Sequence, residues 1–222
     1  MNERRDRLLR DEGLSFFGTI TASLSHEINN VTAIIGELSG LLDDLLLGAE
    51  RGRPIEHDKL KELSQKISGH VIKSKHLIKR LNRFAHSIDE PDTEFDADEL
   101  LDEMTELANR FAFLRGVHLE LEPAGEPIEV RGNPFSLRHA IFTCIELALA
   151  NAEKEDVIHI RLTQEQTSAK ISIPGVRLTM TEEADAKLSL LSLLMNELGG
   201  TAEALAIDDG RHSLSLTIPT RV

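Results

Sequence analysis

The residues best suited to chemistry in this chain are His26, Glu27 and Asn30, which lie within five positions of one another. An imidazole nitrogen with a free lone pair is a nucleophile, and a neighbouring carboxylate can accept the proton on the second ring nitrogen. A side-chain amide can hold the oxygens of a transferred group or position a water. These residue types at this spacing indicate a histidine that accepts a group from a partner molecule.

The surrounding pattern predicts that this histidine faces water. Apolar residues recur at alternating intervals of four and three, which is typical of a helix with one apolar seam per heptad. His26 lies two residues from Leu24 and from Ile28, so at about 100° per residue it points roughly 200° from the seam. Asn30 is one turn further along the same face. The seam residues are Leu24, Ile28, Val31, Ile35, Leu38, Leu42 and Leu45.

Two long helices are expected in the first part of the chain, from about residue 4 to Leu47 and from about Glu56 to Ile88, with glycines and a proline between them. Their matching seams and short connection predict an antiparallel hairpin. One hairpin leaves part of its seams uncovered, so we predict a homodimer in which two hairpins form a four-helix bundle. The alternative is a hairpin that packs on the second domain of its own chain. The second seam comprises Leu60, Leu63, Ile67, Leu77, Leu81, Phe84 and Ile88, with His70 and Ser74 in the same series.

The second helix is also rich in basic residues. Such a run indicates either a solvated helix face or a docking surface for an acidic partner. The basic residues are Lys59, Lys61, Lys66, Lys73, Lys75, Lys79, Arg80 and Arg83.

The remainder of the chain predicts a second domain, so that the domains are residues 1–90 and 91–222. Residues 89–98 are interpreted as a linker that ends in a helix cap, because Asp96 and Glu99 have the spacing of a capping box. The order helix, strand, helix, strand, strand, helix, strand, strand predicts an α+β fold with helices on one face of a sheet. The helices are expected at 99–114, 137–152 and 184–198, and the strands at 117–121, 157–162, 169–173, 201–207 and 213–218, with a turn at 208–210.

Charge and composition exclude several classes of function. Residues 1–90 hold 14 basic and 14 acidic side chains, whereas residues 91–222 hold 11 and 24, so the whole net charge of −13 lies in the second part. This balance argues against a nucleic-acid partner, which requires a basic surface. The single cysteine, Cys144, excludes an internal disulfide, and the histidines show no paired metal-ligand spacing. No apolar run is long enough to span a membrane and the N-terminus is charged, so we expect a cytoplasmic protein without a membrane partner.

The string Ser25-His26-Glu27-Ile28-Asn29-Asn30 resembles the phosphoacceptor box of two-component histidine kinases, in which His-Glu-x-x-Asn is followed by proline and leucine. Here Val31 stands in the place of that proline. The segments 132–140, 198–201 and 213–219 are similar to parts of the ATP-binding domain of the same family. The resemblance covers nearly the whole chain. It implies a dimeric helical hairpin followed by an α/β sandwich like the histidine kinase ATPase domain.

The nucleotide motifs of that family are absent. The family's magnesium-binding asparagine positions correspond to Thr143 and Leu147, and leucine cannot ligate a hard cation. The stretch 171–177 lacks the aspartate that reads adenine in the family. The stretch 187–190 lacks the glycines that let backbone approach phosphates. We therefore expect a degenerate domain that binds no cofactor.

The resemblance and these departures together suggest a histidine phosphotransfer protein of a phosphorelay. In this interpretation His26 exchanges a phosphoryl group with the aspartate of response-regulator receiver domains, and the receiver supplies Mg²⁺. Glu27 orients the ring and Asn30 holds phosphoryl oxygens or a water. Two alternatives stay open: an active histidine kinase with divergent ATP motifs, and a non-catalytic pseudokinase regulator that binds a receiver or a kinase.

Overall fold

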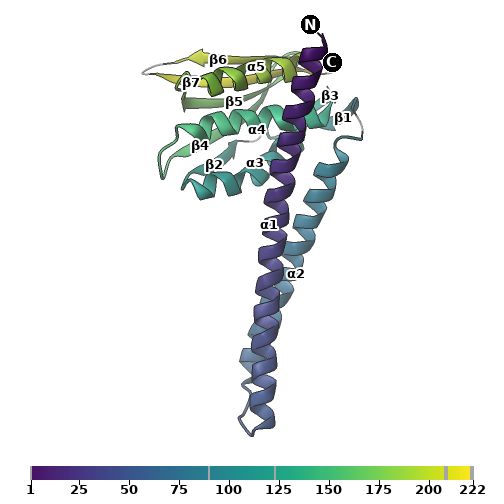
Figure 1. The fold of residues 1–222 in the computed structure, drawn as a ribbon, viewed down its shortest axis with the longest axis vertical. Coiled ribbons are helices and arrows are strands. Elements are labelled where there is room, and N and C mark those ends of the chain that lie inside the picture. The colour runs from purple at the N-terminus through teal and green to yellow at the C-terminus, as the bar shows by residue number, and fades with distance from the viewer. Residues whose placement is uncertain (1, 90, 123, 208–209, 221–222) are drawn as a thin grey trace. The chain divides into compact units, whose positions relative to one another are not determined.

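The computed structural model describes residues 2–89, 91–122, 124–207 and 210–220. The chain forms two compact units, one of Met1–Phe17 with His86–Val222 and the other of Gly18–Ala85. Helix α1, Asn2–Glu50, is uninterrupted and contributes residues to both units (Figure 1). The division expected at residue 90 assigned all of this helix to the first domain, whereas here its first segment groups with the C-terminal unit.

The unit Gly18–Ala85 is the predicted antiparallel hairpin. Helix α1 is followed, after a short turn, by helix α2, His57–His86 (Figure 1). The apolar seams face the hairpin interior, because Leu24, Val31, Leu63 and Leu77 are buried. Nearer the turn the seam residues of α1 are only half-buried. The heptad pattern therefore predicted correctly which face of each helix is covered.

The hairpin also leaves large apolar side chains in contact with solvent. Ile78 on α2 is 44% exposed and Leu41 on α1 is 52% exposed. Both lie beside the seam rather than on the opposite face, and an exposed apolar patch of this kind is typical of a protein–protein interface. The exposed apolar residues of the hairpin are Ile34, Leu41, Leu46, Leu47, Val71, Ile72 and Ile78.

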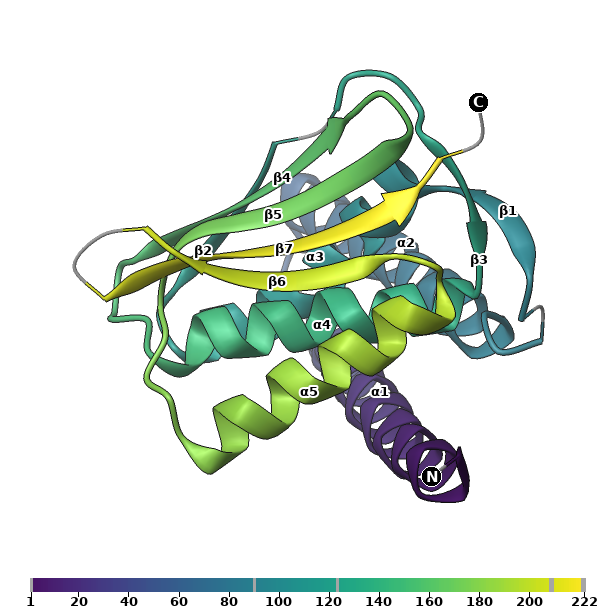
Figure 2. The same cartoon turned by 90° about the horizontal axis from the view of Figure 1, so that it is seen from above.

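The C-terminal unit is an α+β layer structure, as predicted. Its five-stranded sheet has the order β2-β4-β5-β7-β6, in which β2 is parallel to β4 and the other pairs are antiparallel. Helices α3, α4 and α5 cover one face of this sheet (Figure 2). The elements are α3 Ala97–Leu114, β2 His118–Glu122, α4 Pro134–Ala150, β4 Val157–Gln164, β5 Ser168–Arg177, α5 Glu182–Glu197, β6 Thr201–Ala206 and β7 Arg211–Pro219. The turn predicted between the last two strands falls on residues 208–209, which lie outside the described residues.

A second, two-stranded sheet was missed by the sequence prediction. Strand β1, Thr93–Asp96, pairs antiparallel with β3, Glu129–Gly132. The interpretation of residues 89–98 as a linker is therefore wrong for β1, because a four-residue strand whose partner is more than 30 positions away carries no local signal. The predicted cap is confirmed: Asp96 begins α3 and its carboxylate accepts from the backbone N–H of Asp98 and of Ile128.

Helix α4 is the centre of the C-terminal core. It begins at Pro134 after the cap residue Asn133, whose side chain accepts two backbone hydrogen bonds. It packs against α3, α5 and the sheet, which explains why it is apolar on nearly all sides. Its buried Arg138 is paired with Glu103 of α3 at 2.9 Å. Burial raises the pKa of the Cys144 thiol to about 12, so this cysteine is an inert core residue.

A cluster of aromatic rings joins the first segment of α1 to α4. Phe16 is stacked on His139 with ring centroids 4.7 Å apart and planes 3° from parallel, and it also contacts Phe135 and Phe142. Both Phe16 and His139 are at most 4% exposed. Offset and stacked ring pairs of this kind stabilise packing beyond the area that they bury. This cluster accounts for the grouping of Met1–Phe17 with the C-terminal unit.

Among the described residues, no helix has an apolar stretch of the length required to cross a membrane.

The buried imidazole of His139 makes stability depend on pH. Burial lowers the pKa of His139 to about 4, below the 6.5 of an exposed histidine. Between these values the unfolded chain binds the proton and the folded chain does not, so stability falls as the pH drops from 6.5 to 4, by up to about 3 kcal/mol. Chemical unfolding followed by circular dichroism across this range is expected to show a shallower pH dependence in His139→Phe than in the wild type. His76→Phe, at an exposed histidine of α2, is the control, and an unchanged slope in His139→Phe would contradict the assignment.

Candidate functional site

His26 lies on the face of α1 turned away from the apolar seam. Its side chain is exposed, whereas Leu24 and Val31 on either side of it along the helix are 3% exposed. The predicted orientation is confirmed, and its cause is the helical period, because burial of the seam places the second residue after Leu24 on the solvent side. A partner molecule can reach the imidazole without unfolding of the hairpin.

The ring is held by Asn30, one helical turn further on. Asn30 Nδ2 lies 3.0 Å from His26 Nδ1. In this orientation the Asn30 amide N–H donates to Nδ1 of His26, so the single N–H proton of the neutral ring must be on Nε2. A half-turn of the amide presents Oδ1 instead, which accepts a proton from Nδ1 and leaves the Nε2 lone pair free. Asn30 occupies Nδ1 in both orientations, but only the second leaves a free lone pair on Nε2, so that is the orientation in which Nε2 can act as a nucleophile.

Glu27 is half-buried next to the histidine. Within the described part of α1, the hydrogen bond to the imidazole comes from Asn30 and none comes from Glu27. The orienting role that the sequence suggested for Glu27 is performed at Nδ1 by the Asn30 amide in this structure. The spacing of four residues was the signal for this contact, since side chains at i and i+4 meet on a helix surface.

The residues at the positions where the resemblance implied nucleotide binding are engaged in core packing. Thr143 is 2% exposed and its hydroxyl donates to the backbone carbonyl of His139, while Leu147 is 3% exposed. Asn151 ends α4 as its C-cap and accepts a hydrogen bond from Thr179. These side chains hold helix α4 in the core, and Leu147 offers no oxygen to a cation.

Helix α5 packs against α4 and buries one of its sides. Lys187 lies 3.3 Å from Glu146 of α4, and at the other end of the helix pair Ser136 donates to Glu197. Between these polar contacts α5 buries Leu191 and Leu194. Neither link was predicted from the sequence, because each joins residues that are more than 40 positions apart and each is a single polar pair.

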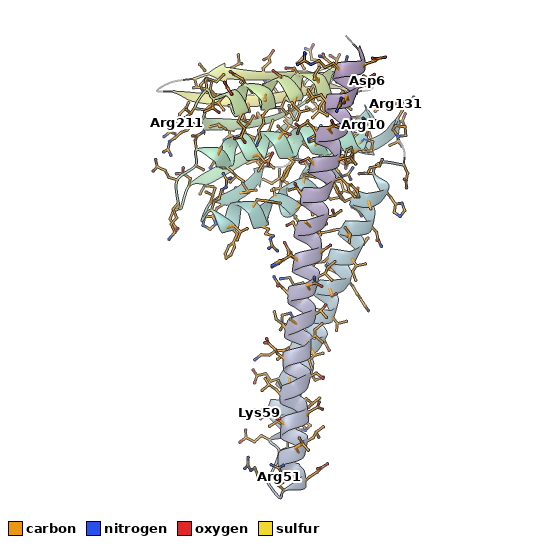
Figure 3. The ribbon with its side chains drawn as sticks, in the orientation of Figure 1. Asp6, Arg10, Arg51, Lys59, Arg131 and Arg211 are labelled. Atoms are coloured by element: carbon orange, nitrogen blue, oxygen red, sulfur yellow. The ribbon has the colours of Figure 1, made fainter. Side chains whose placement is uncertain are left out.

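The basic residues of α2 are mostly exposed, as expected for either interpretation of that run. Lys66 is paired with Glu62 on the same helix. Lys59 lies close to the turn between the two helices, as does Arg51 (Figure 3). Exposed pairs of this kind contribute little to stability, so the lysines are available to a partner of opposite charge.

Comparison with known proteins identifies the fold. No protein-family model and no curated protein sequence matches the chain. The histidine kinase ThkA in complex with the response regulator TrrA is 19% identical, with a TM-score of 0.51 over 99% of this chain and 66% of that chain. The ATP-binding domain of PrrB from Mycobacterium tuberculosis is 20% identical, with a TM-score of 0.50 over 60% of this chain and 100% of that chain. The chain therefore has a histidine kinase-like fold, with a helical hairpin and an α/β domain as in the cytoplasmic region of those kinases.

The contact between Asn30 and His26 is expected to set the tautomer of the neutral ring. Asn30→Ala removes the partner of Nδ1, so the Nδ1 chemical shift of His26 in ¹⁵N-edited NMR should move toward that of a free imidazole. The residue is exposed, and stability should change by less than about 0.5 kcal/mol. Asn29→Ala is the matched control, since Asn29 is a neighbouring exposed asparagine. Identical His26 shifts in wild type and Asn30→Ala would show that the hydrogen bond is not formed.

Proposed function

We propose that this protein is a histidine phosphotransfer protein of a two-component phosphorelay, with His26 as the residue that carries the phosphoryl group. The observation that supports this most directly is the exposed imidazole whose Nδ1 is held by Asn30 on the outer face of a helical hairpin. The histidine kinase-like fold and the resemblance of the segment around His26 to a phosphoacceptor box support a role in two-component signalling.

The proposed step is a phosphoryl exchange with a receiver aspartate. The Nε2 lone pair attacks the phosphorus of an aspartyl phosphate, the N–P bond forms as the P–O bond breaks, and the aspartate leaves as a carboxylate. The ring becomes more acidic as it gains the phosphoryl group, and Nδ1 then releases its proton to water, or through water to the carboxylate of Glu27. Mg²⁺ held by the receiver would neutralise the negative charge on the phosphoryl oxygens during the transfer. The reverse reaction loads a second receiver.

The packing around α4 favours phosphotransfer over ATP-dependent phosphorylation. A kinase needs a cleft for the nucleotide and oxygen ligands for its magnesium. In this chain Leu147 stands where the resemblance implied a magnesium ligand, and Glu146 of α4 is paired with Lys187 of α5. The structural neighbours are themselves kinases, however, so ATP-dependent kinase activity is the second candidate and is tested in the same experiment.

His26 is expected to be the phosphorylated residue. Purified protein is incubated with a phosphorylated receiver domain and, in parallel, with labelled ATP and Mg²⁺. We expect acid-labile label from the receiver alone. His26→Ala should reduce it by at least 100-fold and leave the circular dichroism spectrum unchanged, since the side chain is exposed. His76→Ala, at another exposed histidine, is the control and should label like the wild type.

The outcomes of that experiment separate the three interpretations. Label from ATP that is lost in His26→Ala would establish a histidine kinase and overturn the proposal. Receiver binding with no label from either donor would leave a non-catalytic pseudokinase regulator. Label that persists in His26→Ala would show that another residue carries the phosphoryl group.

We also propose that the hairpin forms a homodimer. The exposed apolar residues beside the seam, among them Ile78, need a cover, and a second hairpin supplies one of matching period. Ile78 adjoins the buried Leu77, whereas Ile72 on the same helix lies about 140° away from Leu77 and is also exposed.

Substitution of these two isoleucines should distinguish the faces. The wild type is expected to have the mass of a dimer in size-exclusion chromatography with light scattering at micromolar concentration. Ile78→Glu should shift it toward the monomer, because burial of a charge at the interface is unfavourable, and Ile72→Glu should leave it a dimer. A monomeric wild type would instead support a hairpin that is covered within its own chain.

A further inference from the structure

A small polar cavity lies at the end of the sheet where β5 ends and β7 begins. Its volume is about 100 Å³. Pockets for drug-sized ligands are several times larger, on the order of 300–1,000 Å³, so this one has room for an ion or a few waters. The residues that give it polarity or shape are Asn151, Asp156, Gly175, Arg177 and Arg211.

Two arginines face each other across the strands at this cavity. Arg177 of β5 and Arg211 of β7 are register partners in the antiparallel ladder. Like charges placed directly opposite each other destabilise a strand pair unless carboxylates or a bound anion offset them. Arg211 lies at the tip of the sheet, on the left in Figure 3.

The two guanidinium groups differ in their partners. Arg177 uses Nη1 for two carboxylates, with Glu153 at 3.0 Å and Asp156 at 3.2 Å. Its Nε and Nη2 have no partner among the described residues. Arg211 is exposed and makes no ion pair within the described part of the chain. The cavity therefore presents guanidinium N–H groups of Arg177 and Arg211 that have no partner among the described residues, although this half of the chain is acidic overall. Local positive charge of this kind attracts anions.

The rest of the cavity lining includes the Asn151 amide, which is a hydrogen-bond donor, and a segment of β5 with an irregular backbone. Thr179 donates to Asn151 Oδ1 at 3.2 Å, which leaves the amide N–H groups of Asn151 as the free end of that side chain. The β5–β7 register shifts between Ile173 and Val176, and Gly175 in the shifted segment has a φ of 74°. A residue with a side chain is strained in this conformation, and glycine leaves that side of the cavity open.

The same stretch is where the resemblance implied an aspartate that reads adenine. Arg177 lies in this stretch, and Arg211 lies opposite it on β7. An aspartate would accept hydrogen bonds from a ligand, whereas these two guanidinium groups donate them. We propose that this cavity binds a small oxyanion of the size of inorganic phosphate, held by Arg211, Arg177 and the Asn151 amide. Charge-assisted hydrogen bonds from a guanidinium suit a tetrahedral oxyanion, and the volume excludes a nucleoside.

Inorganic phosphate is the probe for this site. The protein is titrated with phosphate at constant ionic strength, with calorimetry and the ¹⁵Nε–H signals of the arginine side chains as readouts. We expect saturable binding that shifts the Arg177 and Arg211 signals, and an affinity about tenfold weaker in Arg211→Gln, which lacks one charged donor pair. Arg161→Gln is the matched control, because Arg161 lies on β4 of the same sheet, pairs with Glu122 and does not line the cavity.

Each outcome bears on the proposal. Absence of saturable phosphate binding, or equal affinity in the wild type and Arg211→Gln, would overturn it. Adenosine carries no phosphate and is expected not to compete; competition by adenosine would show that the site retains a nucleoside preference and would overturn the assignment to an oxyanion. The test does not involve His26, so its result is independent of phosphotransfer.

Discussion

Burial of the apolar seam of α1 is the constraint on which the rest of the candidate site depends. Once Leu24 and Val31 are packed in the hairpin, the helical period fixes the directions in which the side chains between them point. His26 must face solvent, and Asn30 must lie one turn beyond it on the same face. The site therefore requires no cleft, loop or cofactor for its geometry. It needs only a stable amphipathic helix, and a partner can supply everything else.

In the C-terminal unit the central helix α4 is buried on nearly all sides, whereas α1 has one face in contact with solvent. In α4 the positions that the resemblance assigned to nucleotide binding are packed in the core, as Thr143 and Leu147 illustrate. A helix so enclosed cannot change its packing without loss of stability. Polar contacts to α5 and the aromatic stack on Phe16 add to the same enclosure. The unit has the layers of the histidine kinase-like fold.

The elements with local patterns were predictable and those that depend on distant pairing were not. Both long helices, the three helices of the second unit and the five strands of the main sheet carry a period or a cap that can be read from neighbouring residues, as at Asp96. Strands β1 and β3 are four residues each and are defined by each other across more than 30 positions. For the same reason the contact of Phe16 with His139 has no signature in either segment, since it becomes visible only when α1 and α4 are brought together.

The sequence by itself determined which side of the first helix carries His26, because periodicity is a local property of the chain. It also determined that an acidic α+β domain follows a hairpin with equal numbers of basic and acidic side chains. Only the tertiary structure decided that the start of α1 belongs with the C-terminal unit, that Phe16 stacks on His139, and that Arg177 lies opposite Arg211. These are questions of distance and rotamer between particular atoms, and such distances are set by packing across the whole chain rather than by any one segment.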